Sequence, residues 1–172
     1  ENERECIKVK YRSIHATMKN LTSVDVANLL RNFALKEHFV NLNKTQVNKL
    51  LFMCYGFYLA STGKKLFLET PKAWPYGPVF PNVYKSYYLF SVPIYIEDEK
   101  QMEFDSDLKA KNICKQVIDK FCRVSAYDLS MWSHQPGSPW HDTVYGVNGK
   151  KTGWNKEISD DVIKAYFARH LK

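Results

Sequence analysis

The segment 44–62 (KTQVNKLLFMCYGFYLAST) limits what this chain can fold into more than any other, because it is apolar on every side at helical spacing. One stripe consists of Val47, Leu50, Leu51, Cys54, Tyr55, Tyr58 and Leu59, and the opposite side carries Phe52, Met53 and Phe57. A helix that is apolar all round belongs in the middle of a domain. Asn43 and Gln46 have capping-box spacing before it, and Gly63 suits a helix C-terminus. We therefore predict a mainly α, single compact domain around a central buried helix over 44–62.

Further helices are predicted from capping residues, or from apolar residues that recur at intervals of three and four. They are a helix after the pair Thr22 and Asp25, helices over 82–90 and 106–123, a helix after the pair Ser125 and Asp128, and a last helix after Ser159. A small extended element is predicted near 66–74 and 93–96, with a solvated turn at 97–100 and a loop over 147–157.

The N-terminal residues 6–14 alternate between apolar and basic side chains, which is the pattern of a half-buried strand. Ile7, Val9 and Tyr11 would lie on one face, and Lys8, Lys10 and Arg12 on the other. We expect residues 1–20 to be an N-terminal extension containing this strand, and 21–172 to be the domain proper. The apolar face of the predicted strand would need a partner, in this fold or on another chain.

Composition excludes some classes of protein and leaves others open. The net charge of +7 suits nucleic acid or an acidic protein, but the basic residues are dispersed rather than gathered in one block. No apolar run reaches the ~20 residues of a membrane-spanning helix, so no membrane partner is expected. The four cysteines lack a CxxC motif, and Cys114 and Cys122 are ~12 Å apart along a helix. Reduced thiols and a cytoplasmic location are expected.

The residues that could carry catalysis or bind metal do not form a convincing site. Cys122 with His134 is the best nucleophile and base pair, yet Cys122 falls on the apolar face of its helix. His134, His141 and Asp142 match no zinc spacing, and the 7 glycines form no phosphate-binding loop. We therefore predict no enzyme activity, no catalytic residues, no metal and no cofactor.

The segment 73–79 (AWPYGPV) places two large aromatic residues between prolines in a rigid, turn-rich loop. Such rings either pack over the central helix as an internal staple or are presented to a partner at low entropic cost. A second segment with aromatic residues follows at Ser133-His134 and Ser138-Pro139-Trp140. His134 there is expected to be a hydrogen-bonding residue rather than a catalyst.

These segments resemble the Panacea antitoxin domain family, the SocA-like and GepA-like phage-associated proteins. The resemblance covers about residues 22–168. It is carried by TQVNKLL from Thr45 to Leu51, GKKLF from Gly63 to Phe67, AWPYGPV from Ala73 to Val79, and the later pair LSMWSH and SPW ending at Trp140. The tryptophan, glycine and proline motif followed by the histidine and Pro-Trp motif is the specific part.

This resemblance implies an antitoxin of a bacterial or phage toxin–antitoxin pair, which neutralises a cognate toxin by direct protein–protein binding and has no catalytic residues. The alternatives are a proteolytic adaptor or phage regulatory protein that binds a cellular protease or host factor, and a nucleic-acid-binding protein. The candidate partner-binding residues are Trp74, Tyr76, Gly77, Pro78, Val79, Tyr84, His134, Trp140, Lys8, Lys10 and Arg12.

Overall fold

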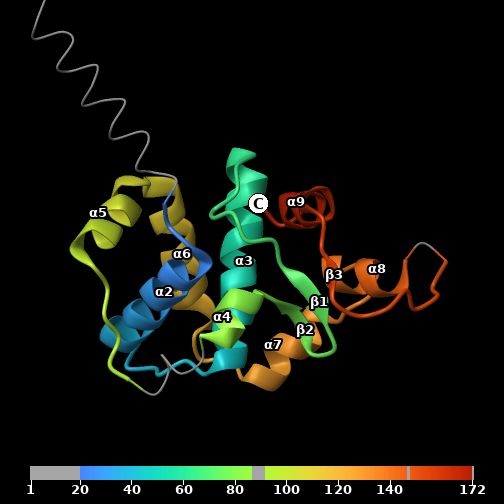
Figure 1. Cartoon of the computed structure of the whole chain (residues 1–172), viewed down its shortest axis with the longest axis horizontal. Helices are drawn as coiled ribbons and strands as arrows, with labels where there is room; N and C mark the ends of the chain where they lie inside the picture. Colours follow the sequence, from blue (N-terminus) through green and yellow to red (C-terminus); the bar gives the residue numbers. More distant parts are fainter. Residues whose placement is uncertain (1–19, 87–91, 147, 172) are drawn as a thin grey trace, which may run out of the picture.

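The mainly helical architecture is confirmed in the computed structural model, which describes residues 20–86, 92–146 and 148–171. Helix α3 (Lys44–Thr62) stands in the middle (Figure 1). Helices α2 (Ser23–His38), α5 (Asp98–Ser106) and α6 (Leu108–Phe121) lie on one side of it. The other side holds a small sheet with α7 (Ala126–Ser133), α8 (Pro139–Tyr145) and α9 (Asp160–Ala168), and the short α4 (Pro81–Lys85) crosses α3.

Helix α3 begins and ends where the sequence predicted. The side chain of Asn43 accepts a hydrogen bond from the backbone of Gln46, and that of Gln46 accepts one from Asn43, which completes the capping box. Gly63 ends the helix in the left-handed conformation with φ 70°. Nearly all of the helix between Val47 and Leu59 is buried, because the neighbouring elements cover both faces.

The predicted caps of the other helices are also present. The hydroxyl of Thr22 accepts from Asp25 N, that of Ser125 from Asp128 N, and that of Ser159 from Val162 N. Each bond satisfies one backbone N–H that a helix start leaves without an intrahelical partner. The caps that the sequence indicated at Thr22, Ser125 and Ser159 are therefore confirmed.

The sheet is antiparallel with the order β2-β1-β3, formed by Lys72–Trp74, Gly77–Val79 and Lys156–Glu157 as β1, β2 and β3. Trp74 pairs with Gly77, so Pro75 and Tyr76 form a two-residue turn between β1 and β2. We call β1, this turn and β2 the hairpin. Strand β3 adds to the other edge of β1, where Lys72 pairs with Glu157. The predicted extended element near 66–74 is thus partly right, because its last three residues form β1.

Three local predictions were wrong. Residues 93–96 form no strand, and Pro93 has no backbone N–H to donate to a ladder. Residues 97–100 are not a turn, because α5 starts at Asp98, where acidic side chains in a first helical turn stabilise the helix dipole. Residues 66–68 are bends, and Phe67 instead packs in the core against Tyr55 and Phe80, with ring centroids 5.4 and 5.1 Å away.

The loop predicted over 147–157 is interrupted by β3, and residues 139–145 form α8, which the sequence analysis missed. The predicted strand at 6–14 lies outside the described residues, as do residues 87–90 at the end of the predicted helix over 82–90. Within the part of the chain that is described, no helix is long and apolar enough to cross a membrane. Cys54, Cys114 and Cys122 are buried free thiols.

Candidate functional site

The hairpin brings most of the predicted binding residues to one place, between α3, α4, α7 and α8. The residues Gly77, Pro78, Val79 and Trp140 are buried there, whereas Trp74 and His134 are half-buried. Tyr76 is different, since 81% of its surface is exposed at the turn. We call the buried residues Gly77, Pro78, Val79 and Trp140, with the side chains that bind the hairpin backbone, the frame, and we call Tyr76 the tip.

Side chains from three helices hold the hairpin by its backbone carbonyl groups. The indole Nε1 of Trp140 in α8 donates to the carbonyl oxygen of Trp74 at 2.7 Å. Nε2 of His134, just after α7, lies 3.1 Å from the carbonyl oxygen of Pro75. Since a carbonyl oxygen can only accept, this contact is a hydrogen bond in the forms of His134 that carry a proton on Nε2. The third bond, to Pro78, comes from the central helix.

That third donor is Lys49, the only lysine buried among the residues that the structure describes, with an exposure of 3%. Its Nζ donates to the carbonyl oxygen of Pro78 at 3.0 Å. Burial away from water disfavours the charged amine and lowers the pKa of Lys49 from 10.5 to about 8. The sequence analysis did not single out Lys49. The signal was a lysine within an otherwise apolar stretch, and buried lysines are rare.

A fourth bond fixes the end of the hairpin. Asn48, also buried in α3, accepts from the backbone N–H of Phe80 at 2.9 Å and donates to the carbonyl oxygen of Lys44 at 3.1 Å. Neighbouring residues of one helix therefore bind the backbone on either side of Val79. Buried polar groups of this kind specify a single arrangement, since displacing them leaves unsatisfied partners.

Gly77 is required by two independent features of this frame. Its φ of 111° is a conformation that residues with a side chain rarely adopt. A Cβ atom at this position would also lie 2.5 Å from Ser133 Oγ and 2.7 Å from Lys49 Cε. The hairpin backbone can therefore approach α3 and α7 this closely only with glycine.

The outer face of the hairpin carries an aromatic pair. Trp74 donates from Nε1 to Asn155 Oδ1 at 2.9 Å, and its ring meets Tyr84 edge to face with centroids 5.0 Å apart. Lys44 Nζ lies 3.7 Å from the centre of the Tyr84 ring. Tyr84 is 39% exposed, so this aromatic pair is partly accessible to a partner.

Helix α7, which contacts β2, carries exposed residues of its own. His134, which holds Pro75, directly follows this helix, and Met131 lies one turn before it with 45% exposure. Tyr127, a further turn back, is 72% exposed. Exposed aromatic residues and methionine are enriched where proteins bind one another. Lys8, Lys10 and Arg12 lie outside the described residues.

The residues considered for catalysis are dispersed. Cys122 is 1% exposed, and burial raises the pKa of its thiol, which opposes formation of the nucleophilic thiolate. His134 contacts the carbonyl oxygens of Ser130 and Pro75, and His141 lies 3.9 Å from Asp142. No group of three His, Cys, Asp or Glu side chains in the described ranges could hold a metal ion.

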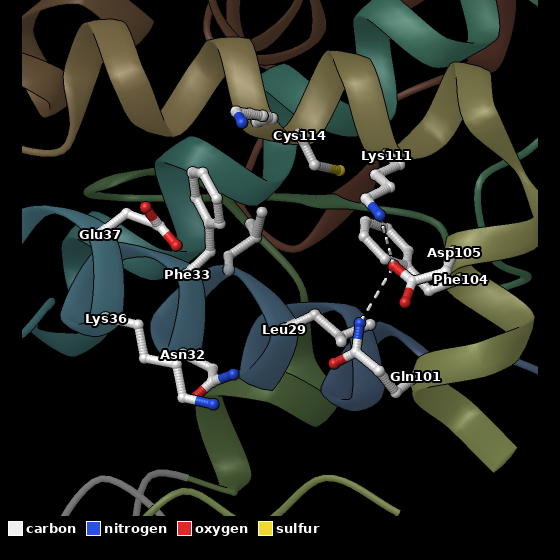
Figure 2. Close-up of a pocket in the computed structure, with 12 residues that line it drawn as sticks. Leu29, Asn32, Phe33, Lys36, Glu37, Gln101, Phe104, Asp105, Lys111 and Cys114 are labelled. Carbon is white, nitrogen blue, oxygen red and sulfur yellow. Dashed lines mark hydrogen bonds and ion pairs between the residues drawn. The ribbon is translucent and has the colours of Figure 1, made fainter. Parts of the chain in front are cut away.

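A cavity of about 280 Å³ lies on the other side of the molecule, between α2, α5 and α6 (Figure 2). Three of its polar side chains contact one another, because Gln101 Nε2 and Lys111 Nζ approach Asp105 Oδ1 at 3.2 and 3.1 Å. The rest of its wall includes the apolar Leu29, Phe33 and Phe104. We find no convergent set of reactive groups in it.

Comparison with known proteins bears on the same motifs. The family described as "Antitoxin SocA-like, Panacea domain" matches residues 47–141, more than half of the chain, from α3 into α8. The protein Antitoxin SocA of Caulobacter vibrioides (strain NA1000 / CB15N) is 29% identical over 152 residues, which cover 83% of this chain and 80% of that protein. No solved structure matches the chain significantly.

Proposed function

The chain belongs to the SocA-like Panacea antitoxin family, and from that premise we propose that it neutralises a cognate toxin by direct protein–protein binding, without catalysis. The observation that favours a binding role for the hairpin is the contrast between its frame and its tip. The backbone on both sides of Tyr76 is held by side chains of three helices, while the ring itself is 81% exposed.

A rigid aromatic tip is suited to binding for an energetic reason. Association costs free energy when side chains and loops must become ordered, and a segment already held in place loses less freedom. Tyrosine combines a large apolar ring with a hydroxyl, and such residues often carry most of the binding energy at an interface. We propose Tyr76 as the anchor, with Tyr84 and the exposed edge of Trp74 as its surroundings. Gly77, Pro78, Val79, His134 and Trp140 would act indirectly, by positioning the tip.

The basic N-terminal segment is proposed as the element that selects the partner. Lys8, Lys10 and Arg12 alternate with apolar residues, which suits the addition of a strand to a partner's sheet. Their charge, with the net +7 of the chain, would accelerate association with an acidic toxin and make the rate fall as salt rises. We also propose a cytoplasmic location, because the buried free thiols of Cys54, Cys114 and Cys122 suit a reducing compartment.

Co-expression with the product of the neighbouring gene, the first candidate toxin, tests this function. Growth rescue and co-purification are measured for the original chain, Tyr76→Ala and a deletion of residues 1–14. Tyr95→Ala is the matched control, since Tyr95 is 79% exposed in the segment that leads into α5. We expect Tyr76→Ala to weaken the complex by more than about tenfold, which corresponds to ~1.4 kcal/mol.

The melting temperature separates binding from folding in this experiment. The melting temperature of Tyr76→Ala should equal that of the original chain, because the Tyr76 side chain is mostly exposed. Retained affinity in this variant would move the docking site away from the hairpin. Rescue that survives deletion of residues 1–14 would remove the selecting role of the N-terminal segment. Salt-sensitive binding to DNA or RNA without any toxin complex would favour the nucleic-acid alternative instead.

A further inference from the structure

We propose that an apolar groove between α3, α6, α7 and α9 binds an amphipathic helix of a partner protein whose apolar stripe is flanked by acidic residues. The groove has a volume of about 270 Å³. Met53 and Phe57 of α3, Phe121 of α6, Trp132 of α7, and Tyr166 and Phe167 of α9 contribute its main surfaces. None of the hairpin residues lines it, so this surface is additional to the proposed toxin-binding tip.

The groove is formed before any partner arrives, because its rings brace one another. Phe57 and Phe167 meet edge to face with centroids 4.8 Å apart, and Trp132 lies 6.4 Å from Phe167. Phe57, Phe121 and Trp132 nevertheless keep part of their surface exposed to water. A preformed apolar surface can gain binding energy from desolvation without first ordering itself.

The shape favours side chains of a helix over a small-molecule ligand. Pockets for small molecules have volumes of about 300–1,000 Å³ and contain a few convergent polar groups. This groove is smaller, and the polar residues on its lining, Asp128 and His170, belong to opposite walls, α7 and the end of α9. Helix-in-groove recognition instead needs an apolar trough that accepts side chains at positions i, i+3, i+4 and i+7.

The charges around the groove identify the chemistry of the occupant. Two exposed basic residues directly precede lining residues in the chain: Lys120 before Phe121, and Arg169 before His170. Arg123, which precedes Val124, instead donates from its guanidinium to the carbonyl oxygen of His38 at 2.8 Å. The guanidinium of Arg169 lies 5.7 Å from the centre of the Tyr166 ring, which places its charge at the groove edge. Asp128 is the acid facing them from α7. The surplus of cations complements a helix with acidic flanks.

Two synthetic peptides of about 18 residues, long enough to form helix, provide the test. Both carry leucine at positions i, i+3, i+4 and i+7. One has glutamate at the positions that flank this stripe, and the other has lysine there. Fluorescence anisotropy of labelled peptides measures the dissociation constants. We expect the acidic peptide to bind at least about tenfold more tightly than the basic one, and its affinity to fall as salt rises.

Substitutions locate the binding. Val124→Trp fills the groove and should abolish peptide binding, while Arg169→Glu should weaken the acidic peptide about threefold to tenfold. Lys164→Glu is the matched control on α9, since Lys164 Nζ lies beside Gly63 instead, 3.9 Å from the position of an added Cβ. Tyr76→Ala should leave peptide binding unchanged, which separates this surface from the hairpin.

The proposal is overturned if the acidic peptide does not bind, or if the two peptides bind equally. It is also overturned if acidic-peptide binding survives in both Val124→Trp and Arg169→Glu. Should Val124→Trp fail to fold, the comparison between Arg169→Glu and Lys164→Glu decides alone, because both residues are exposed. Failure of toxin neutralisation would leave these outcomes unaffected, since no toxin is present.

Discussion

Nζ of Lys49 lies 3.0 Å from the carbonyl oxygen of Pro78, so a buried amine of the central helix holds the strand that follows the exposed turn. This contact joins the most buried helix of the fold to the strand that follows Tyr76, whose surface is 81% exposed. It also places a titratable group where water is excluded, and the stability of the protein should depend on its charge.

The first prediction concerns pH. The pKa of Lys49 is lowered to about 8 in the folded protein, whereas the unfolded chain keeps the ordinary value of 10.5. Between these values the native state has released a proton that the unfolded state still holds, so the free energy of unfolding rises with pH. Between about pH 8 and 9.5, Lys49 should raise the free energy of unfolding by ~2 kcal/mol, because each pH unit adds up to ~1.36 kcal/mol.

Urea denaturation of the original chain and Lys49→Met across this window measures that contribution as a difference between the two proteins. The rise should be absent in Lys49→Met and retained in Lys64→Met, whose side chain is exposed. Burial also raises the pKa values of Cys54 and Cys122, so ionisation of these thiols in the unfolded chain lowers the stability of every variant alike within the window, and the Lys49 contribution is the difference between the proteins. The window ends near pH 9.5 because burial and hydrogen bonding raise the pKa values of Tyr55 and Tyr58. Their ionisation in the unfolded chain lowers stability above about pH 10. Parallel pH profiles for the original chain and Lys49→Met would contradict the prediction.

The second prediction tests the close approach at Gly77. Gly77→Ala should destabilise the fold by ~2–4 kcal/mol, because it adds a strained φ and a clash with Ser133 and Lys49. Gly137→Ala is the control, since Gly137 has φ 83° but no atom within 4 Å of an added Cβ. It should cost only about 1 kcal/mol. Equal losses would mean that the frame relaxes around the methyl group.

The third prediction concerns Trp140. Trp140→Phe keeps an aromatic ring but removes the donor to the carbonyl oxygen of Trp74 and leaves a small cavity. Thermal and urea denaturation should show a loss of ~2–4 kcal/mol. Trp154→Phe should cost less than ~1 kcal/mol, because the Trp154 side chain is 40% exposed. If Trp140→Phe loses no more stability than Trp154→Phe, the hydrogen bond from Trp140 to Trp74 contributes little to the stability of the fold.

The fourth prediction addresses the core. Leu51→Ala should destabilise the protein by ~2–5 kcal/mol, and Leu59→Ala by a similar amount, because these side chains are 0% and 4% exposed. Leu68→Ala removes the same atoms from a side chain that is 81% exposed, and its midpoint in urea should stay close to that of the original chain. If Leu68→Ala proved as costly as Leu51→Ala, the packing around α3 would differ from that described here.

Local signals in the sequence were sufficient for the helices. An apolar pattern on all sides predicted that α3 is central, and the cap residues Asn43, Ser125 and Ser159 placed helix starts correctly. These signals operate within one turn of helix, so they need no knowledge of distant residues. The same reasoning failed at 97–100, because an acidic run suits both a solvated turn and the first turn of a helix.

The sequence by itself determined the mainly helical class, the central helix and the existence of a rigid aromatic loop between Trp74 and Val79. Only the tertiary structure decided that Tyr76 is exposed while Trp140 is buried, since exposure depends on what packs against each ring. It also decided the strand partners of β1, because β3 lies more than eighty residues along the chain. The role of Lys49 emerged in the same way, because its acceptor on Pro78 and its loss of hydration are created only when α3 and the hairpin meet.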